Sequence, residues 1–196
     1  MQRKYMLKWM GTVALTLAVG LNGFSAAEEN SLAQQKDTAS EPPLYFVAQY
    51  DPQRDPAKDL AEALRLANKE KKHVLLQVGG DWCGWCRIMT DYFHDTKTVR
   101  ASLSKNYVIM KVNYSSDNKN DVFLSAYPKV PAFPHLFVLD GKGKLLCSQY
   151  TGDLEDGGSY SEENVLGFLN KWTPAAVATA ASENDEQSAA PSVGTD

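Results

Sequence analysis

A pair of cysteines, Cys83 and Cys86, stands between a short apolar run and an amphipathic segment, and this position constrains the fold more than any other feature. The run 74–78 is almost continuously apolar, as in a strand that is buried on both faces. Two glycines end the run, and apolar residues then recur at helical spacing over 85–93. The pair is therefore predicted to lie where a buried strand passes into the first turn of a helix.

That position predicts a reactive thiol. The free N–H groups and the dipole at a helix N-terminus favour negative charge. We expect them to stabilise the Cys83 thiolate and to hold its pKa below the usual value of about 8.5. The thiolate is the nucleophile in disulfide exchange. Cys86 follows one turn later, where it can attack a mixed disulfide, so the spacing predicts Cys83 as nucleophile and Cys86 as resolving cysteine.

Two other interpretations of the cysteine pair remain open. A C-x-x-C pair also forms half of many zinc sites, but the other possible ligands form no second close pair; they are His73, His94, His135 and Cys147. A purely structural disulfide would close only a small loop and so stabilise the fold little. We predict no metal. Cys147 is predicted to be a small buried apolar residue, with mixed-disulfide formation as the alternative.

The remaining patterns predict a layered α/β domain. Helices are expected within 56–71, over 121–127 and over 161–172, and strands over 107–114, 136–139 and 144–150. The early alternation of helix and strand favours parallel strands with crossover helices. The last two strands, joined by a tight turn at 140–143, add an antiparallel hairpin. The predicted class is therefore a central mixed sheet flanked by helices.

The two ends of the chain differ from this domain. Residues 1–27 have the three-part pattern of a cleaved secretory signal, with a positive start, 13 mostly apolar residues and small residues before Glu28. Residues 28–43 are predicted to be a flexible lead-in and 44–173 the folded domain. Residues 174–196 are rich in alanine, serine and acidic residues, and the composition predicts a disordered tail.

Charge and composition narrow the possible partners. The chain carries a net charge of −4, and removal of residues 1–27 would leave 17 basic against 24 acidic residues, a net of −7. This balance argues against nucleic acid as a partner. No glycine-rich phosphate loop follows a strand, so no cofactor is predicted. We expect an exported, periplasmic monomer, in a compartment where disulfides persist.

Two segments of the sequence resemble the thioredoxin-like superfamily. The first is Gly80-Asp81-Trp82-Cys83-Gly84-Trp85-Cys86-Arg87, which has the tryptophan before the first cysteine and the basic residue after the second. The second is Phe133-Pro134-His135-Leu136-Phe137-Val138-Leu139-Asp140, which resembles the proline and core strand of that family. The resemblance covers roughly residues 56–172 and implies a thioredoxin-like fold.

The resemblance also implies roles for individual residues. A cis Phe133–Pro134 bond beside the disulfide is implied, with Pro131 as the competing position. Phe133 and Pro134 would then bind substrate backbone together with Trp82, Gly84 and Trp85 around the cysteines, although helix-face packing explains Trp85 equally well. His135 follows the proline, and we predict it as a proton-transfer residue, with a hydrogen-bonded strand residue as the alternative.

One departure from the family concerns proton transfer. Many thioredoxins carry a buried acid six positions before the first cysteine, where this chain has Gln77. The predicted function is nevertheless an exported thiol–disulfide oxidoreductase that acts on protein thiols and disulfides. A reductase or relay supplied by a membrane electron donor is favoured, because Gly84-Trp85 adds no cation between the cysteines. An oxidase or isomerase, or a non-enzymatic thioredoxin-fold binding module, is the alternative.

Overall fold

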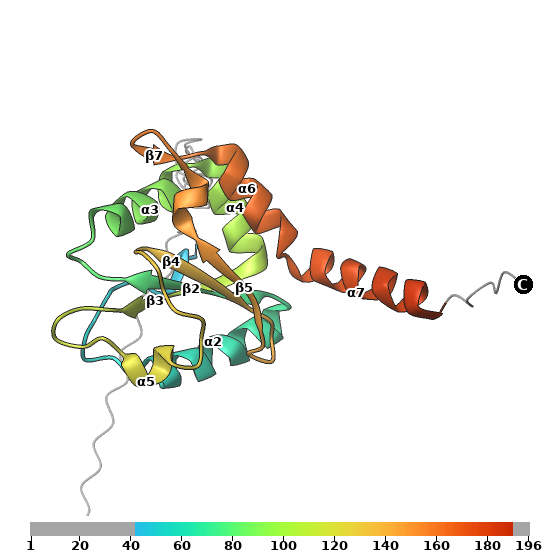
Figure 1. Cartoon of the computed structure of the whole chain (residues 1–196), viewed down its shortest axis with the longest axis horizontal. Coiled ribbons are helices and arrows are strands. Elements are labelled where there is room, and N and C mark those ends of the chain that lie inside the picture. Colours follow the sequence, from blue (N-terminus) through green and yellow to red (C-terminus); the bar gives the residue numbers. More distant parts are fainter. Residues whose placement is uncertain (1–41, 190–196) are drawn as a thin grey trace, which may run out of the picture. The chain divides into compact units, whose positions relative to one another are not determined.

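The computed structural model describes the backbone of residues 42–189 and the side chains of residues 42–183. The predicted signal peptide and most of the predicted lead-in lie outside these residues. The described part is built around one five-stranded sheet with the strand order β1-β3-β2-β4-β5 (Figure 1). The strands are β1 (Tyr45–Val47), β2 (His73–Gly79), β3 (Tyr107–Asn113), β4 (His135–Leu139) and β5 (Leu145–Tyr150).

The sheet is mixed, as the sequence predicts. Strands β1 and β2 both run parallel to β3, whereas β4 is antiparallel to β2 and β5 is antiparallel to β4. Every residue of β2 is buried, because this strand lies at the centre of the sheet and helices cover both of its faces. The predicted fold class is therefore confirmed, and the strand that precedes the cysteines is buried along its whole length.

Helices cover the two faces of the sheet unequally. Helices α2 (Pro56–Glu70) and α5 (Asp121–Leu124) lie on one face, and α3 (Gly84–Asp95), α4 (Lys97–Asn106) and α6 (Glu162–Lys171) lie on the other (Figure 1). Alternate residues of β2 serve the two cores. Leu75 packs with Met89 and Phe93 of α3, whereas Leu76 packs with Ala63 and Ala67 of α2.

Several elements escaped the sequence prediction. Strand β1 has only three residues, too few to show a period, and α4 buries only Val99 and Leu103. A short 3-10 helix, η1 (Thr151–Leu154), and a two-stranded ribbon of β6 (Glu155–Asp156) and β7 (Ser159–Tyr160) join β5 to α6. These pieces are short or mostly polar, so their stability depends on tertiary contacts.

The predicted disordered tail is wrong over most of its length. Helix α7 spans Pro174–Ala189 and begins where the Thr173 hydroxyl accepts a hydrogen bond from the backbone N–H of Ala176 at 3.1 Å. Its first half is rich in alanine, which has the highest helix propensity. No described side chain of α7 is buried. Composition alone missed it because local propensity, and not core burial, favours the helix.

None of the helices within the described residues is long and apolar enough to cross a membrane.

Candidate active site

Cys83 and Cys86 form a disulfide at the point where β2 leads into α3. Cys83 is the N-cap of α3, and its Sγ accepts a hydrogen bond from the backbone N–H of Cys86 at 3.1 Å. The first turn of α3 holds no acidic residue that would repel a thiolate. Cys83 is 5% exposed and Cys86 is fully buried. Of the two residues, only Cys83 therefore retains any exposure to solvent.

Two glycines at the end of β2 make room for this arrangement. A Cβ on Gly79 would overlap Sγ of Cys86 and would lie 3.0 Å from the hydroxyl oxygen of Tyr50. A Cβ on Gly80 would overlap the Trp82 indole and lie 2.8 Å from the carbonyl oxygen of Tyr114. The backbone at Gly79 therefore lies so close to the disulfide that any residue with a Cβ would overlap the Cys86 sulfur.

An aromatic surface borders the disulfide on its solvent side. Trp82 is 57% exposed, and its indole N–H donates a hydrogen bond to the carbonyl oxygen of Tyr114 at 2.7 Å. Its ring meets Phe133 edge to face with centroids 5.5 Å apart, and Phe133 stacks on Tyr114 at 4.6 Å. Trp82 is thus held in one orientation while much of its ring stays in water.

Phe133 belongs to the loop that approaches the cysteines before β4. The Phe133–Pro134 peptide bond is cis, whereas the bond before Pro131 is not among the cis bonds of the described residues. The Thr151 hydroxyl donates a hydrogen bond to the carbonyl oxygen of Pro134 at 2.6 Å and ties the loop to η1. Phe133 also packs against the cluster formed by the two cysteines.

A polar group of side chains lies on the buried side of the disulfide. Gln77 is fully buried, and its Oε1 accepts a hydrogen bond from the Tyr45 hydroxyl at 2.9 Å. Tyr50 packs against both cysteines. The ammonium group of Lys111 lies 5.1 Å from the ring centroid of Tyr45 and 5.0 Å from that of Tyr50. Burial lowers the pKa of Lys111.

Known proteins share this architecture. Residues 55–141 match a family model described as thioredoxin-like. The chain contains a thioredoxin-like domain. The crystal structure of a disulphide isomerase from Xylella fastidiosa is 23% identical, with a TM-score of 0.55, and the match covers 64% of this chain and 97% of that one. This likeness shows that the thioredoxin-like domain has the same fold.

More distant structures complete the comparison. The C-terminal domain of DsbD from Neisseria meningitidis, in its reduced form, is 21% identical with a TM-score of 0.45, over 60% of this chain and 96% of that one. A thioredoxin from Thermus thermophilus is also 21% identical, with a TM-score of 0.44, over 57% of this chain and 81% of that one. No curated protein matches the sequence.

Within the thioredoxin-like domain, the two residues between the cysteines differ in their surroundings. Gly84 is exposed and begins α3. Trp85 is partly buried, and its ring meets Tyr160 edge to face at 5.5 Å. The Tyr160 hydroxyl also donates a hydrogen bond to the carbonyl oxygen of Trp85 at 3.4 Å. Packing against β7 therefore accounts for Trp85, and its contact with a partner stays a prediction.

The structure argues against His135 as a proton-transfer residue. Side chains alternate along β4, and His135 shares a face with Phe137, whose ring lies 4.7 Å away and packs in the core beneath α2. The disulfide lies on the opposite side, at the start of α3. His135 is buried, its Nε2 is hydrogen-bonded to Ser148 Oγ at 2.8 Å, and burial lowers its pKa to about 4. These contacts agree with the alternative predicted from the sequence, in which His135 is a hydrogen-bonded residue of the strand.

The third cysteine stands apart from the pair. Cys147 is a free, half-buried thiol on β5, where it faces Val138 of β4 across the ladder. Burial raises the pKa of its thiol, so the reactive thiolate is disfavoured. Among the described residues, no three or more histidine, cysteine, aspartate or glutamate side chains are grouped so as to hold a metal ion.

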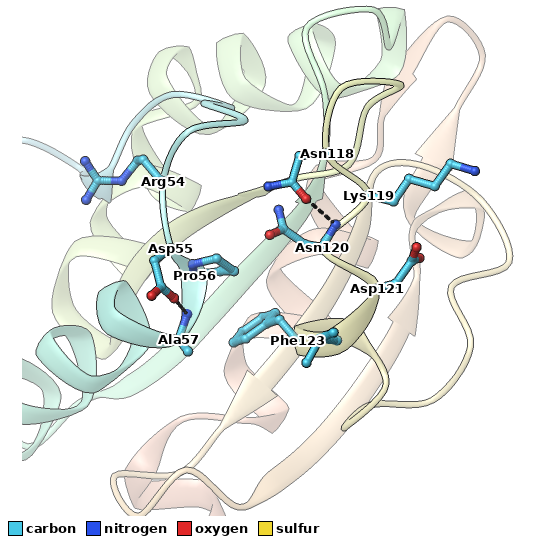
Figure 2. Close-up of a pocket in the computed structure, with 10 residues that line it drawn as sticks. Arg54, Asp55, Pro56, Ala57, Asn118, Lys119, Asn120, Asp121 and Phe123 are labelled. Carbon is cyan, nitrogen blue, oxygen red and sulfur yellow. Dashed lines mark hydrogen bonds between the residues drawn. The ribbon is translucent and has the colours of Figure 1, made fainter.

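A separate pocket of about 510 Å³ lies between the start of α2 and the segment 118–123 (Figure 2). Its polar groups are largely engaged within the chain. Arg54 donates two hydrogen bonds to the Asp59 carboxylate, Asp55 caps α2, and Asn118 Oδ1 accepts from the Asn120 N–H at 2.9 Å. None of the residues predicted from the sequence to form the site lines this pocket.

Proposed function

We propose that this chain is an exported thiol–disulfide oxidoreductase that reduces protein disulfides, or relays electrons to them, through Cys83 and Cys86. The observation that carries the proposal is the unequal exposure of the two sulfurs at the start of α3. Cys83 meets solvent and holds the N-cap position, whereas Cys86 is enclosed. This difference supports Cys83 as the cysteine that a partner sulfur reaches and Cys86 as the one that attacks from within.

The exchange then proceeds in two displacements. The Cys83 thiolate attacks a partner disulfide, forms a mixed disulfide and releases one partner sulfur as a thiolate. The Cys86 thiolate next attacks Sγ of Cys83, closes the internal disulfide and releases the second partner sulfur. Two electrons pass from the dithiol to the partner. The N–H group of Cys86 and the α3 dipole stabilise the negative charge on Cys83 before it attacks the partner disulfide.

The surroundings of Cys83 fit a polypeptide partner. Trp82 and Phe133 border the sulfur, and Phe133 also lines an open groove of about 400 Å³ with Tyr114, Leu124, Tyr127 and Val130. The wall of this groove combines these aromatic and apolar side chains with three polar ones, which are Asp121, Ser125 and Lys129. We propose that it receives the residues next to the partner's cysteine, and that the backbone at Phe133 and Pro134 pairs with the partner's extended chain.

The residues between the two cysteines support the proposed direction of electron flow. Neither Gly84 nor Trp85 carries a charge, so the two residues between the cysteines do not stabilise the reduced pair as a cation at that place would. A reductase in an oxidising periplasm must be recharged, and we propose a membrane protein as its electron donor. The predicted signal peptide, residues 1–27, supports export, and the protein would act as a monomer.

The deciding experiment is the reduction potential of the Cys83–Cys86 pair in the full chain with Cys147→Ser. Equilibration in defined glutathione and dithiothreitol buffers, followed by alkylation, gives the reduced fraction. A potential near about −270 mV supports a reductase, and one near about −120 mV would make the protein an oxidant. A pair that never cycles would leave a binding module as the better account.

Trapping tests the assigned roles of the two sulfurs. Cys86→Ser removes the resolving thiol, so mixed disulfides with partner proteins should accumulate through Cys83 and should disappear on reduction. Cys83→Ser is the matched control, because Cys86 is fully buried and should trap nothing. Equal trapping by both variants would contradict the assignment.

A further inference from the structure

Two polar atoms behind the disulfide have no hydrogen-bond partner among the described residues. They are the hydroxyl oxygen of Tyr50 and the amide nitrogen of Gln77, two side chains that approach each other without forming a hydrogen bond of standard geometry. Both residues are buried, Tyr50 at 6% exposure and Gln77 at 0%. A buried polar group without a partner destabilises the fold by about 1–3 kcal/mol. Such a group therefore points to a second state of the protein in which it is satisfied.

The position of the Tyr50 hydroxyl identifies that state. This oxygen and Sγ of Cys86 both lie close to the backbone of Gly79. A Cβ on Gly79 would overlap the sulfur and would lie 3.0 Å from the hydroxyl oxygen. Tyr50 also packs directly against the two cysteines. The sulfur of a disulfide is a weak hydrogen-bond acceptor, whereas a thiolate is a strong one. Reduction of the pair thus creates an acceptor beside the hydroxyl.

We propose that the Tyr50 hydroxyl donates a hydrogen bond to the Cys86 thiolate and thereby speeds the resolving attack on the mixed disulfide. This inference rests on the proposed function and adds a residue to it. Tyr50 acts as a donor and stays protonated throughout, since burial keeps its pKa well above 10. In the overall exchange, the proton that Cys86 loses is balanced by the proton that a released partner thiolate takes up.

The charges around Tyr50 agree with this role. Besides the two cysteines of α3, the titratable groups facing Tyr50 are Tyr45 of β1, Asp81 of the loop after β2, Lys111 of β3 and Tyr160 of β7. Lys111 lies on the buried side, over the rings of Tyr45 and Tyr50, and its positive charge favours a thiolate. Asp81 opposes it, but this carboxylate is exposed and therefore screened by solvent.

Reaction with dithiobis(nitrobenzoate) separates the two chemical steps. The Cys83 thiolate first forms a mixed disulfide with one half of the reagent and releases the other half as a coloured thiolate. The Cys86 thiolate then forms the Cys83–Cys86 disulfide and releases the second half. Stopped-flow absorbance of the reduced full chain with Cys147→Ser records both releases, and their pH dependence reports the pKa of each cysteine.

Tyr50→Phe keeps the buried ring and removes only the hydroxyl. We expect the second release at pH 7 to slow by about tenfold, the size that follows from loss of one hydrogen bond to a charged group. The pKa of Cys86 should rise and the first release should stay within twofold. Tyr107→Phe is the matched control. Its hydroxyl is bonded to the carbonyl oxygen of Leu169 at 2.6 Å, at the other end of the sheet, so both releases should keep their rates.

The stability of the oxidised variant completes the test. In the oxidised protein Tyr50→Phe removes a hydroxyl that has no hydrogen-bond partner. The oxidised variant should therefore unfold at the same temperature as the oxidised parent, or at a higher one. Oxidised Tyr50→Phe that does not fold, or a second release that slows less than twofold, would overturn the proposal. If the parent chain gives no second release at all, the proposed oxidoreductase function fails instead.

Discussion

A single methyl group at Gly79 should change the redox balance of the pair. In Gly79→Ala the new Cβ would overlap Sγ of Cys86 and would come within 3.0 and 3.2 Å of the hydroxyl oxygen and Cζ of Tyr50. In the oxidised protein neither neighbour can yield, because the disulfide fixes the sulfur and the tyrosine ring is buried. In the reduced protein the Cys86 side chain is free to rotate. The contact with Tyr50 affects both redox forms, but the overlap with the sulfur is relieved only on reduction, so the substitution destabilises the oxidised form more.

The size of this effect follows from the cost of overpacking. An extra methyl in a well-packed core costs about 1–3 kcal/mol. For a two-electron couple, about 1.4 kcal/mol corresponds to about 30 mV, so the potential of Gly79→Ala should rise by about 20–65 mV. The glutathione equilibrium measures the shift, and thermal unfolding of both redox forms should show that the oxidised one loses the stability.

Gly84→Ala is the matched control for this prediction. A Cβ at that position lies 3.9 Å from the Arg87 side chain, and α3 gains helix propensity in both redox forms. Its potential should stay within a few millivolts of the parent. A Gly79→Ala potential equal to the parent's, or lower, would refute the argument that the backbone at Gly79 sits too close to the sulfur for any side chain.

Three further predictions concern the stability of the fold. His135 is buried with a pKa lowered from 6.5 to about 4, so its contribution to stability is fully present above pH 6.5 and is lost as the pH falls toward 4. In His135→Gln the free energy of unfolding, measured with denaturant, should fall by up to about 3 kcal/mol less between pH 6.5 and pH 4 than in the parent. An unchanged pH dependence would show that other groups cause the loss of stability in acid. Asp55→Ala removes the cap that accepts from the N–H groups of Ala57 and Lys58, at 3.0 and 3.3 Å, and should cost about 1 kcal/mol in urea unfolding. A loss below about 0.3 kcal/mol would mean that water caps the helix equally well. Phe93→Ala empties a fully buried site and should cost about 3–5 kcal/mol by the same assay, whereas a loss under about 1 kcal/mol would mean that the core collapses around it.

The sequence predicted the elements with strong local patterns. Strand β2 was recognisable because its run 74–78 is apolar apart from Gln77, and α6 because Ser161 caps it before an apolar stripe. Strand β1 and helix α4 carried no such pattern. Helix α7 has the opposite property, since its alanines favour a helix while no described side chain is buried. Helix propensity and core burial stabilise a helix independently, and the composition of this segment reports only how much surface it can bury.

The same limit applies to the site. The two cysteines, Trp82 and the Phe133–Pro134 segment stand in continuous motifs, so the sequence could bring them together. Tyr50 lies in a polar stretch between β1 and α2 with no motif around it, and only the tertiary fold brings it to Cys86. His135 failed for a related reason. Neighbouring residues of a strand point to opposite faces, so closeness to Pro134 in sequence does not place a side chain near the disulfide.

The substitution of an acid by Gln77 changes how the resolving thiolate is stabilised. A buried carboxylate behind the disulfide would raise the pKa of a nearby thiol by charge repulsion and would act mainly as a proton acceptor. An amide adds no charge, and here its oxygen is already engaged by the Tyr45 hydroxyl. We propose that a neutral donor, Tyr50, stabilises the thiolate instead, with the Lys111 cation over the Tyr50 ring adding a favourable charge nearby. In the proposed mechanism the resolving step therefore depends on these two groups, which would stabilise the Cys86 thiolate before it attacks.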